Sequence, residues 1–314
     1  MGGKFNINIK VMGIGGGGIN ALDEISTSSI NEVTFFALNT DLQDLNNSKT
    51  LHKIQLGSSA TKGLGCGGNM ELGEKATKET LPLIKNLLKG TDFLFLTSTM
   101  GGGTGSSATA LIAKLAKEMN ILTIAIVTKP FSFEGKRRMK IAEAGIKNLK
   151  PFVDSLIVVP NDKLLDTNTP NLTVQEAFKK SNFVLYTAVK GMTDLMLAKG
   201  FINLDFADIK SLLLSSGEAI LGFGEASGEN RAEKAALAAV DSSLFERSIS
   251  GARKFLVNIV GPKNLNLIES SVIVDTIKNE CGADIDDVLF GVSIDENSKD
   301  TIKVISIANS FINK

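Results

Sequence analysis

The first two-thirds of this 314-residue chain alternate short apolar runs with longer amphipathic segments. The short runs are bounded by Gly, Pro, Asn or charged residues, which is typical of buried parallel strands, and the longer segments carry apolar residues at helical spacing. This alternation predicts an α/β fold with a mostly parallel sheet and helices on both faces. The expected strands are 8–12, 33–38, 92–97, 121–127 and 156–159, and the expected helices are 19–26, 70–88, 106–119 and 138–149.

A long helix is expected next. Thr173 and Glu176 form a capping box at its start, and the pattern continues to Lys199, before Gly200. Beyond it the expected strands partly alternate apolar and polar residues, as in a sheet with one more exposed face. These strands are 255–260, 287–294 and 301–308, with helices at 231–241 and 267–279. The predicted organisation is therefore a domain over 1–173, a connecting helix over 174–199 and a second, smaller α/β domain over 200–314.

Composition excludes several classes of protein. Lys and Arg total 34, as do Asp and Glu, so the formal net charge is zero and argues against an electrostatic grip on nucleic acid or on an anionic membrane. Two distant cysteines, Cys66 and Cys281, and a single histidine, His52, provide neither a disulfide framework nor a zinc pattern. No segment resembles a signal peptide or a membrane span. A secreted protein, a membrane protein and a zinc enzyme are disfavoured, and a cytoplasmic protein with no metal site of its own is expected.

A first glycine loop follows the first strand and opens a helix, at residues 13–20 (GIGGGGIN). Glycines let the backbone approach a phosphate closely, and a helix N-terminus offers N–H groups to an anion. Gly13, Gly15 and Gly18 also satisfy the dinucleotide fingerprint, with Asp41 at the distance of a ribose-binding acid. A tight turn without a ligand is the other interpretation. The loop lacks the Lys-Ser/Thr ending of a Walker loop.

A second glycine loop, at residues 100–107 (MGGGTGSS), follows the strand that ends near Thr97 and also opens a helix. Ligands bind at the carboxyl ends of strands in open α/β sheets. Two such loops can surround a triphosphate from two sides, with the hydroxyl of Thr104 as an additional donor. A dehydrogenase has no need of the second loop.

Several motifs in the same order resemble the FtsZ family of tubulin-like GTPases. The segment 101–106 (GGGTGS) is similar to the tubulin signature loop. The other matching segments are 128–138 (TKPFSFEGKRR), 160–162 (PND), 203–208 (NLDFAD) and 224–231 (GEASGENR). The resemblance extends from about Ile9 to Phe311. It implies a tubulin/FtsZ-like fold: a Rossmann-like GTP-binding domain, a long central helix and a second, smaller α/β domain.

The resemblance also implies the nucleotide-binding residues. It assigns the phosphates to the two loops, at Gly16, Gly17, Gly18, Asn20, Gly103, Thr104 and Gly105. It assigns the ribose to Glu134 with Arg138 beside it, and guanine to Asn182 with Phe178 as a stacking face; Asn161 completes the set. By residue type alone, Glu134 and Arg138 equally suit a surface ion pair, and Phe178 and Asn182 suit a core Phe and a solvated Asn.

The segment 203–208 presents Asp205 and Asp208 three residues apart at a helix start, so they share a face. Two carboxylates can orient and polarise a water for in-line attack on a γ-phosphate. Helix capping is the competing interpretation. In the family this loop, with Asn203, reaches the nucleotide of the next subunit in a head-to-tail filament. Hydrolysis is then switched on by assembly, with catalytic roles for Asn203, Asp205 and Asp208.

The chain departs from the family pattern at a few positions in these motifs. Ile19 replaces a glycine and is expected to resist positive φ and to narrow the approach to the phosphate. Ser106 and Ser107 replace Thr-Gly, and Phe183 replaces a polar residue. We expect these changes to affect nucleotide affinity and turnover more than the fold, and hydrolysis to survive.

The predicted function is that of an assembly-dependent GTPase whose filaments form the bacterial division ring, located in the cytoplasm at the division site. The expected cofactors are GTP or GDP and Mg²⁺. The expected partners are further copies of the chain and, through a tail that the family carries beyond the position of Lys314, other division proteins; nucleic acid and direct membrane insertion are not expected. The alternative is a GTP-binding filament scaffold with little or no hydrolysis. A nicotinamide-dependent dehydrogenase is a remote third, because it leaves the second loop and the aspartates unexplained.

Overall fold

The structure is a computed structural model, which describes residues 7–26, 33–165, 172–197, 202, 204–241, 249, 251–282, 285 and 287–311. The chain divides into two compact units, Met1–Thr187 and Ala188–Lys314. The division falls within helix α7, Val174–Leu197. The domain limits expected at 173 and 200 stay predictions.

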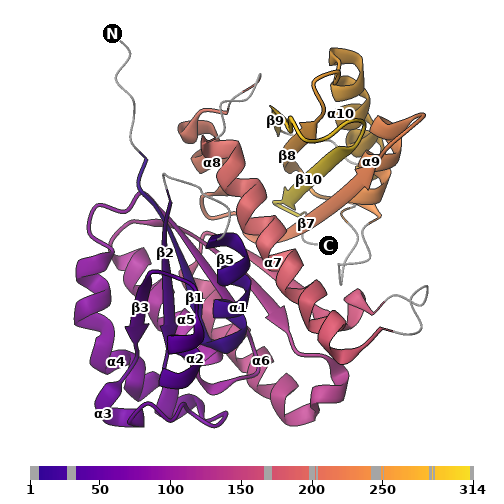
Figure 1. Ribbon diagram of the computed structural model, residues 1–314. Coiled ribbons are helices and arrows are strands. Elements are labelled where there is room, and N and C mark those ends of the chain that lie inside the picture. The colour runs from indigo at the N-terminus through magenta and orange to yellow at the C-terminus, as the bar shows by residue number, and fades with distance from the viewer. Residues whose placement is uncertain are drawn as a thin grey trace. The chain divides into compact units, whose positions relative to one another are not determined.

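The first unit is built on parallel strands in the order β3-β2-β1-β4-β5-β6 (Figure 1). Their side chains are mostly buried, which explains the continuous apolar runs. From β1 the sheet continues through β2 to β3 on one side, and from β4 through β5 to β6 on the other. The strand order therefore reverses between β1 and β4. The strands are β1 Ile9–Ile14, β2 Val33–Asn39, β3 His52–Gln55, β4 Phe93–Thr99, β5 Leu122–Lys129 and β6 Ser155–Pro160.

The helices of the first unit cover this sheet. Helix α5 packs against both α4 and α6, whereas α1 contacts β1, β2 and β4. A buried core that includes Met12, Leu96 and Ile112 joins the strands to the helices. The helices are α1 Gly15–Ser26, α2 Leu42–Asn47, α3 Ser58–Thr61, α4 Met70–Leu87, α5 Gly103–Glu118 and α6 Lys136–Leu149, with short 3-10 turns η1 Ser132–Glu134, η2 Lys150–Phe152 and η3 Asn161–Leu164.

Helix α7 begins at the predicted capping box. The N–H and hydroxyl of Thr173 donate to Glu176 Oε2 at 2.8 and 2.7 Å, and Glu176 N donates to Thr173 Oγ1 at 3.3 Å. These reciprocal bonds satisfy backbone donors that the first turn of a helix leaves unpaired. The predicted end at Lys199 lies outside the described residues.

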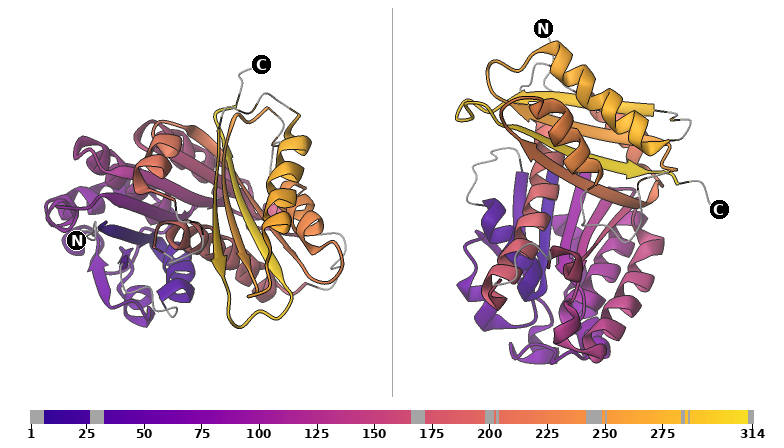
Figure 2. Two further views of the ribbon diagram at one scale, coloured as in Figure 1. Left: turned by 90° about the horizontal axis from the view of Figure 1, so that it is seen from above. Right: turned by 90° about the vertical axis from the view of Figure 1, so that its right-hand side faces the viewer.

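The second unit has a mixed sheet in the order β7-β10-β8-β9, in which β10 is antiparallel to β7 and β8 while β9 is parallel to β8 (Figure 2). Helices α9 and α10 pack against each other, and an apolar core that includes Ala236, Phe255 and Ile277 joins them to the sheet. The elements are α8 Phe206–Leu213, β7 Gly217–Ala226, α9 Arg231–Val240, β8 Lys254–Gly261, α10 Leu267–Cys281, β9 Asp287–Ile294 and β10 Ile302–Asn309.

Strand β7 was not predicted, because its sequence contains three glycines and two glutamates and therefore has no clear apolar period. The structure explains two of these glycines. A Cβ on Gly222 would lie 2.0 Å from the carbonyl oxygen of Ala239, and one on Gly224 would lie 1.9 Å from that of Ala235. Helix α9 therefore rests directly on the backbone of β7, which only glycine allows.

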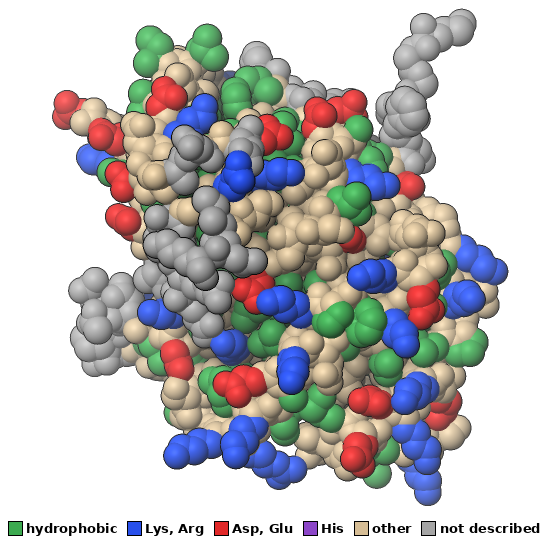
Figure 3. All heavy atoms as spheres, turned by 180° about the vertical axis from the view of Figure 1, so that it is seen from behind, with side chains coloured by type: hydrophobic (Ala, Val, Ile, Leu, Met, Phe, Trp, Pro, Cys, Tyr) green, Lys and Arg blue, Asp and Glu red, His purple; other side chains and the backbone are tan. Residues whose placement is uncertain are grey.

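The predicted α/β class with a mostly parallel central sheet and a second, smaller domain is confirmed. Acidic and basic side chains both occur across the face that Figure 3 shows. Among the helices that the structure describes, none is long and apolar enough to cross a membrane.

Candidate functional site

The two glycine loops meet where the strand order reverses. The register pairs Gly13 of β1 with Thr97 of β4, so both strands end at the same level. Gly15 has φ +74°, and a Cβ on it would lie 3.3 Å from the backbone nitrogen of Gly105. A Cβ on Gly105 would itself lie 2.7 Å from the carbonyl oxygen of Thr99. The loops are thus adjacent at a topological switch point, which is the usual place for a ligand in an α/β sheet.

Both loops form the first turns of helices. Helix α1 begins at Gly15 and α5 at Gly103, so the helix starts expected at residues 19 and 106 are wrong by about a turn. Propensity disfavours glycine in a helix, and here packing against the sheet ends overrides it. The N-cap of α5 is Gly102, which has no side chain to cap the helix. Two adjacent N-termini with first-turn N–H groups and positive dipole ends suit an extended anion.

The hydroxyl of Thr104 points into the protein. Its Oγ1 lies 2.6 Å from Oγ1 of Thr40 and 3.7 Å from Sγ of Cys66, and the Cys66 thiol lies 3.3 Å from Thr40 Oγ1. Only 8% of Thr104 is exposed. In this arrangement the Thr104 hydroxyl lies against Thr40 and Cys66, whereas its backbone N–H belongs to the first turn of α5. The expected role of the hydroxyl as an additional phosphate donor stays a prediction.

The departures from the family pattern fit into regular helix. Ile19 lies within α1 at 2% exposure and does not have a positive φ, so the expected strain there is wrong. Ser106 Oγ accepts from Gly101 N at 2.9 Å, and Ser107 Oγ donates to the Gly103 carbonyl at 2.7 Å. Both serines thus support the second loop from inside.

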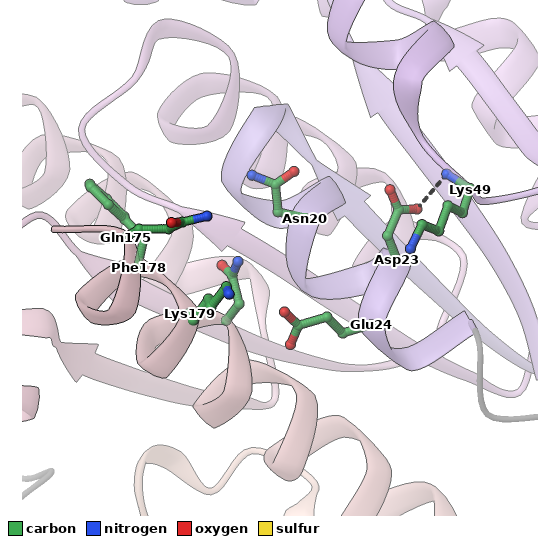
Figure 4. A pocket seen from close by; sticks show the side chains of 8 residues that line it. Asn20, Asp23, Glu24, Lys49, Gln175, Phe178 and Lys179 are labelled. Atoms are coloured by element: carbon green, nitrogen blue, oxygen red, sulfur yellow. Dashed lines mark hydrogen bonds between the residues drawn. The ribbon is translucent and has the colours of Figure 1, made fainter. Parts of the chain in front are cut away.

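A cavity of about 580 Å³ opens between α1 and the first turns of α7 (Figure 4). Its volume is within the usual range for a small-molecule site. Three residues of the predicted set line it: Asn20, Phe178 and Asn182. The other lining residues are Asp23, Glu24, Lys49, Gln175 and Lys179.

Phe178 is held at the cavity by two further rings. Phe131 and Phe133 stack on each other at 5.1 Å, and each meets Phe178 nearly at right angles, at centroid distances of 5.4 and 6.3 Å. Edge-to-face pairs of this kind are favourable. Phe131 is fully buried whereas 38% of Phe178 stays exposed, so Phe178 is an oriented ring with accessible surface.

Glu134 and Arg138 form the ion pair that their spacing allows. Arg138 Nη1 lies 2.5 Å from Glu134 Oε2, and Glu134 Oε1 accepts from Phe131 N at 2.9 Å. The Glu134 side chain is 7% exposed and that of Arg138 is 59% exposed. The acid is therefore a fixed group in the same 3-10 turn as Phe133, one of the rings against Phe178.

Asn161 is fully buried and connects the end of β6 to α7. Its Oδ1 accepts from Ser181 Oγ at 2.8 Å, while its Nδ2 has no hydrogen-bond partner among the described residues. Asn161 thus supports the helix that carries Phe178 and Asn182.

The aspartate segment lies in the second unit, at the start of α8. Asp205 is the N-cap and accepts from Ala207 N at 3.4 Å, as the capping interpretation expected. Asp208 lies in the first turn, and both side chains are exposed. Asn203 lies outside the described residues. No group of three metal-ligating side chains occurs in the part of the chain that the structure describes.

Asp41 has a local role. Its Oδ1 accepts from Gln43 N at 2.9 Å and Asp44 N at 3.2 Å, which caps α2. The carboxylate that the dehydrogenase interpretation needed for a ribose is therefore engaged by the backbone of its own helix.

Sequence reasoning missed five residues that line the cavity: Asp23, Glu24, Lys49, Gln175 and Lys179. Three of them were within its reach, because Glu24 follows Asn20 by four residues and Gln175, Phe178, Lys179 and Asn182 have the i, i+3, i+4, i+7 spacing of one helix face. Lys49 comes from a loop between α2 and β3, and no helical period predicts its place.

Comparison with known proteins gives the family. Residues 8–169 match the model described as Tubulin/FtsZ family, GTPase domain, and residues 217–312 match FtsZ family, C-terminal domain. A W319Y mutant of FtsZ from M. jannaschii is 38% identical, with a TM-score of 0.92 over 96% of this chain and 91% of that one. An empty FtsZ dimer from M. jannaschii is also 38% identical, with a TM-score of 0.90 over 97% and 88%. A GTPgS-bound protofilament of CetZ2 from Haloferax volcanii shares the fold, with a TM-score of 0.81 at 20% identity over 98% and 94%. The two adjacent glycine helix starts, the cavity beside α7 and these matches together show that this chain belongs to the Tubulin/FtsZ family of GTPases, with a GTPase domain followed by an FtsZ C-terminal domain.

Proposed function

We propose that the chain binds GTP in its first unit and hydrolyses it within a head-to-tail filament of its own copies, which forms the bacterial division ring. The observation that carries the proposal is the junction of two glycine-rich helix N-termini beside a cavity with an oriented aromatic ring. Adjacent N-termini suit the triphosphate, and the cavity suits a base.

In this proposal, different residues of the chain bind the phosphates, the ribose and the base. Backbone N–H groups of the two loops bind the phosphates, Glu134 and Arg138 bind the ribose, Phe178 stacks on the base and Asn182 bonds its edge. The residues that provide the loop N–H groups are Gly16, Gly17, Gly18, Gly103, Thr104 and Gly105, with Asn20 at the end of the first loop. The position of Asn20, Phe178 and Asn182 around one cavity and the start of two helices at the glycine loops support this assignment.

Mg²⁺ is expected to arrive with the triphosphate, on which it neutralises charge. The Asp44 carboxylate lies at the first loop. Its Oδ2 accepts from Asn39 Nδ2 at 3.5 Å and lies 3.1 Å from a Cβ built on Gly16. Because the described residues contain no cluster of three ligating side chains, the phosphates and water would supply most of the ligands.

The water-activating groups come from the next subunit in this proposal. Asp205 and Asp208 are exposed at the start of α8, and with Asn203 they would orient and polarise water for attack on the γ-phosphate. A heterologous contact that does not close into a ring generates such a filament. The M. jannaschii FtsZ dimer and the CetZ2 protofilament support self-assembly as a property of relatives. We propose that this filament is located at the division site.

GTP turnover per chain, measured over a range of protein concentrations, tests the proposal. We expect almost no turnover below a threshold concentration and a rise above it. Asp208→Asn should lower turnover above the threshold by about 10²-fold or more, with unchanged GDP affinity, since a positioned acid–base group contributes at least that much. Asp241→Asn, at an exposed aspartate beyond α9, is the matched control and should behave as wild type.

Turnover that does not depend on concentration, or survival of activity in Asp208→Asn, would contradict the shared site. Stable polymers with negligible turnover would instead support the scaffold alternative. The departures at Ile19 and Ser107, which were expected to affect turnover, both lie in regular helix.

A further inference from the structure

The cavity contains two adjacent carboxylates with different environments. Oδ1 of Asp23 accepts from Ser48 Oγ, Lys49 N, Thr50 N and Thr50 Oγ1 at 2.7, 3.0, 3.1 and 2.9 Å. Asp23 is therefore committed to holding the turn before β3, and its loss would cost structure rather than ligand contacts.

Glu24 has a different setting. It lies one turn along α1 from Asn20, and its carboxylate is directed across the cavity toward Lys179 of α7 (Figure 4). Burial raises the pKa of Glu24, and the ammonium groups of Lys179 and Lys49 oppose that rise. A carboxylate on the wall of a cavity and close to two ammonium groups is suited to accept hydrogen bonds from a ligand.

The chemistry of guanine matches this wall. Its Watson–Crick edge has two neighbouring donors, N1–H and the 2-amino group, and one acceptor, O6. A carboxylate accepts from both donors at once, while the Asn182 amide and the Lys179 ammonium on the opposite helix can donate to O6. Adenine presents an acceptor at N1, and xanthine presents a carbonyl at C2, so each would place an oxygen or nitrogen lone pair against the carboxylate.

We propose that Glu24 is a specificity-determining residue, whose carboxylate accepts from N1–H and the 2-amino group of guanine and discriminates against xanthine and adenine. This inference rests on the proposed nucleotide site and adds the residue that selects the base. The competing role for Glu24 is to neutralise Lys179 and Lys49 without touching the ligand.

Dissociation constants for GDP, XDP and ADP, measured on the full chain below the assembly threshold, separate the two roles. In wild type, GDP should bind more tightly than XDP and ADP. Glu24→Gln should weaken GDP by roughly 10- to 100-fold, because hydrogen bonds to a charged group are lost. It should also strengthen XDP, because the glutamine amide donates to the 2-oxo group while its oxygen accepts from N1–H. The preference of GDP over XDP then falls or reverses.

Two further variants complete the test. Glu24→Asp keeps the carboxylate and should retain the preference for GDP over XDP with weaker binding of both. Glu118→Gln removes an exposed carboxylate at the other end of α5 from the loops and should leave all three constants unchanged. Thermal melting of each ligand-free variant confirms that it is folded.

The outcomes distinguish this inference from the proposed function. If Glu24→Gln weakens GDP and XDP equally, or weakens neither, while wild type binds GDP, the nucleotide site stands and Glu24 does not select the base. If wild type binds no GDP at all, the proposed function fails and the inference with it.

Discussion

Gly105 and Gly102 belong to the same loop and have opposite surroundings. A Cβ on Gly105 would lie 2.5 Å from Ser98 Oγ and 2.7 Å from the carbonyl oxygen of Thr99, whereas a Cβ on Gly102 would meet nothing within 4 Å. Because φ at Gly102 is −93°, alanine is also compatible with the backbone there. Packing therefore requires glycine at position 105, whereas at position 102 it leaves room for a side chain.

We expect Gly105→Ala to destabilise the first unit by about 1–3 kcal/mol, the usual cost of forcing atoms into a filled space, and to weaken GDP binding because the start of α5 must move away from the end of β4. Gly102→Ala is the matched control and should change the free energy of unfolding by less than about 0.5 kcal/mol. Urea unfolding of the ligand-free proteins measures both. Equal stability of the two variants would contradict the close packing of the start of α5 on the end of β4.

At the scale of elements, Arg231 joins the starts of two helices to a turn. Its Nε lies 2.6 Å from Glu269 Oε1 at the first turn of α10, and its Nη1 lies 2.7 Å from Asp300 Oδ1 between β9 and β10. Glu269 also accepts from Asn266 N at 3.1 Å in a capping box. The hydrogen bonds that Arg231 donates to Glu269 are the largest cause that lowers the pKa of Glu269. The same bonds are the largest cause that raises the pKa of Arg231. The motif at 224–231 thus has a structural role at its last residue.

The lowered pKa of Glu269 predicts a pH dependence of stability. A carboxyl whose pKa is lower in the folded state stabilises the protein above its unfolded pKa, about 4.3. That contribution is lost as the pH falls from there through the folded pKa. At pH 7 the free energy of unfolding of Glu269→Gln should be about 2–3 kcal/mol lower than that of wild type, because charge-assisted hydrogen bonds are lost. As the pH falls from 5 to 4, the variant should lose less stability than wild type.

Urea unfolding of the two proteins at pH 7, 5 and 4 measures this difference. Glu296→Gln is the control, because Glu296 pairs with Lys263 at 3.3 Å with both side chains more than 70% exposed. Exposed pairs contribute about 0–1 kcal/mol, so this variant should follow the wild-type curve. Parallel pH curves for Glu269→Gln and wild type would contradict the role assigned to Glu269.

At the scale of the whole molecule, the proposed reaction needs the nucleotide residues of one chain and the aspartates of another. Two defective variants should then complement each other. A Phe178→Ala/Asn182→Ala double variant has intact aspartates and a defective base site. Asp208→Asn has an intact base site and a defective aspartate pair. Each alone should be nearly inactive, and an equimolar mixture should recover on the order of a quarter of wild-type turnover, because random order in a heterologous filament makes that share of contacts competent.

The mixture is assayed above the assembly threshold, and its control is each variant mixed with an equal amount of itself at the same total concentration. Recovery in the mixture supports a site built from two chains. A mixture no more active than the mean of its components would mean that each chain must supply both halves of its own site.

The sequence predicted most of the longer strands and helices in their order, because short buried runs and amphipathic segments have different apolar periods, but it did not predict β3, β7, α2 or α3. It also placed a glycine loop after β1 and another after β4 and gave the correct family through its motifs. The carboxyl ends of parallel strands lie at one edge of a sheet, so both loops were expected at that edge. That β1 and β4 are neighbours comes from the structure. Asn20, Phe178 and Asn182 were named by resemblance, and the structure brings them around one cavity.

Only the tertiary structure decided the features that depend on contacts between distant segments. Strand β7 is glycine-rich because α9 rests on its backbone, and Thr104 turns its hydroxyl inward because Thr40 and Cys66 receive it. Glu24 differs from Asp23 because the chain at residues 48–50 engages one carboxylate while α7 faces the other. Periodicity reports which face of an element is apolar, whereas the partner of each polar atom is set by packing between elements, and that packing is what the sequence pattern does not contain.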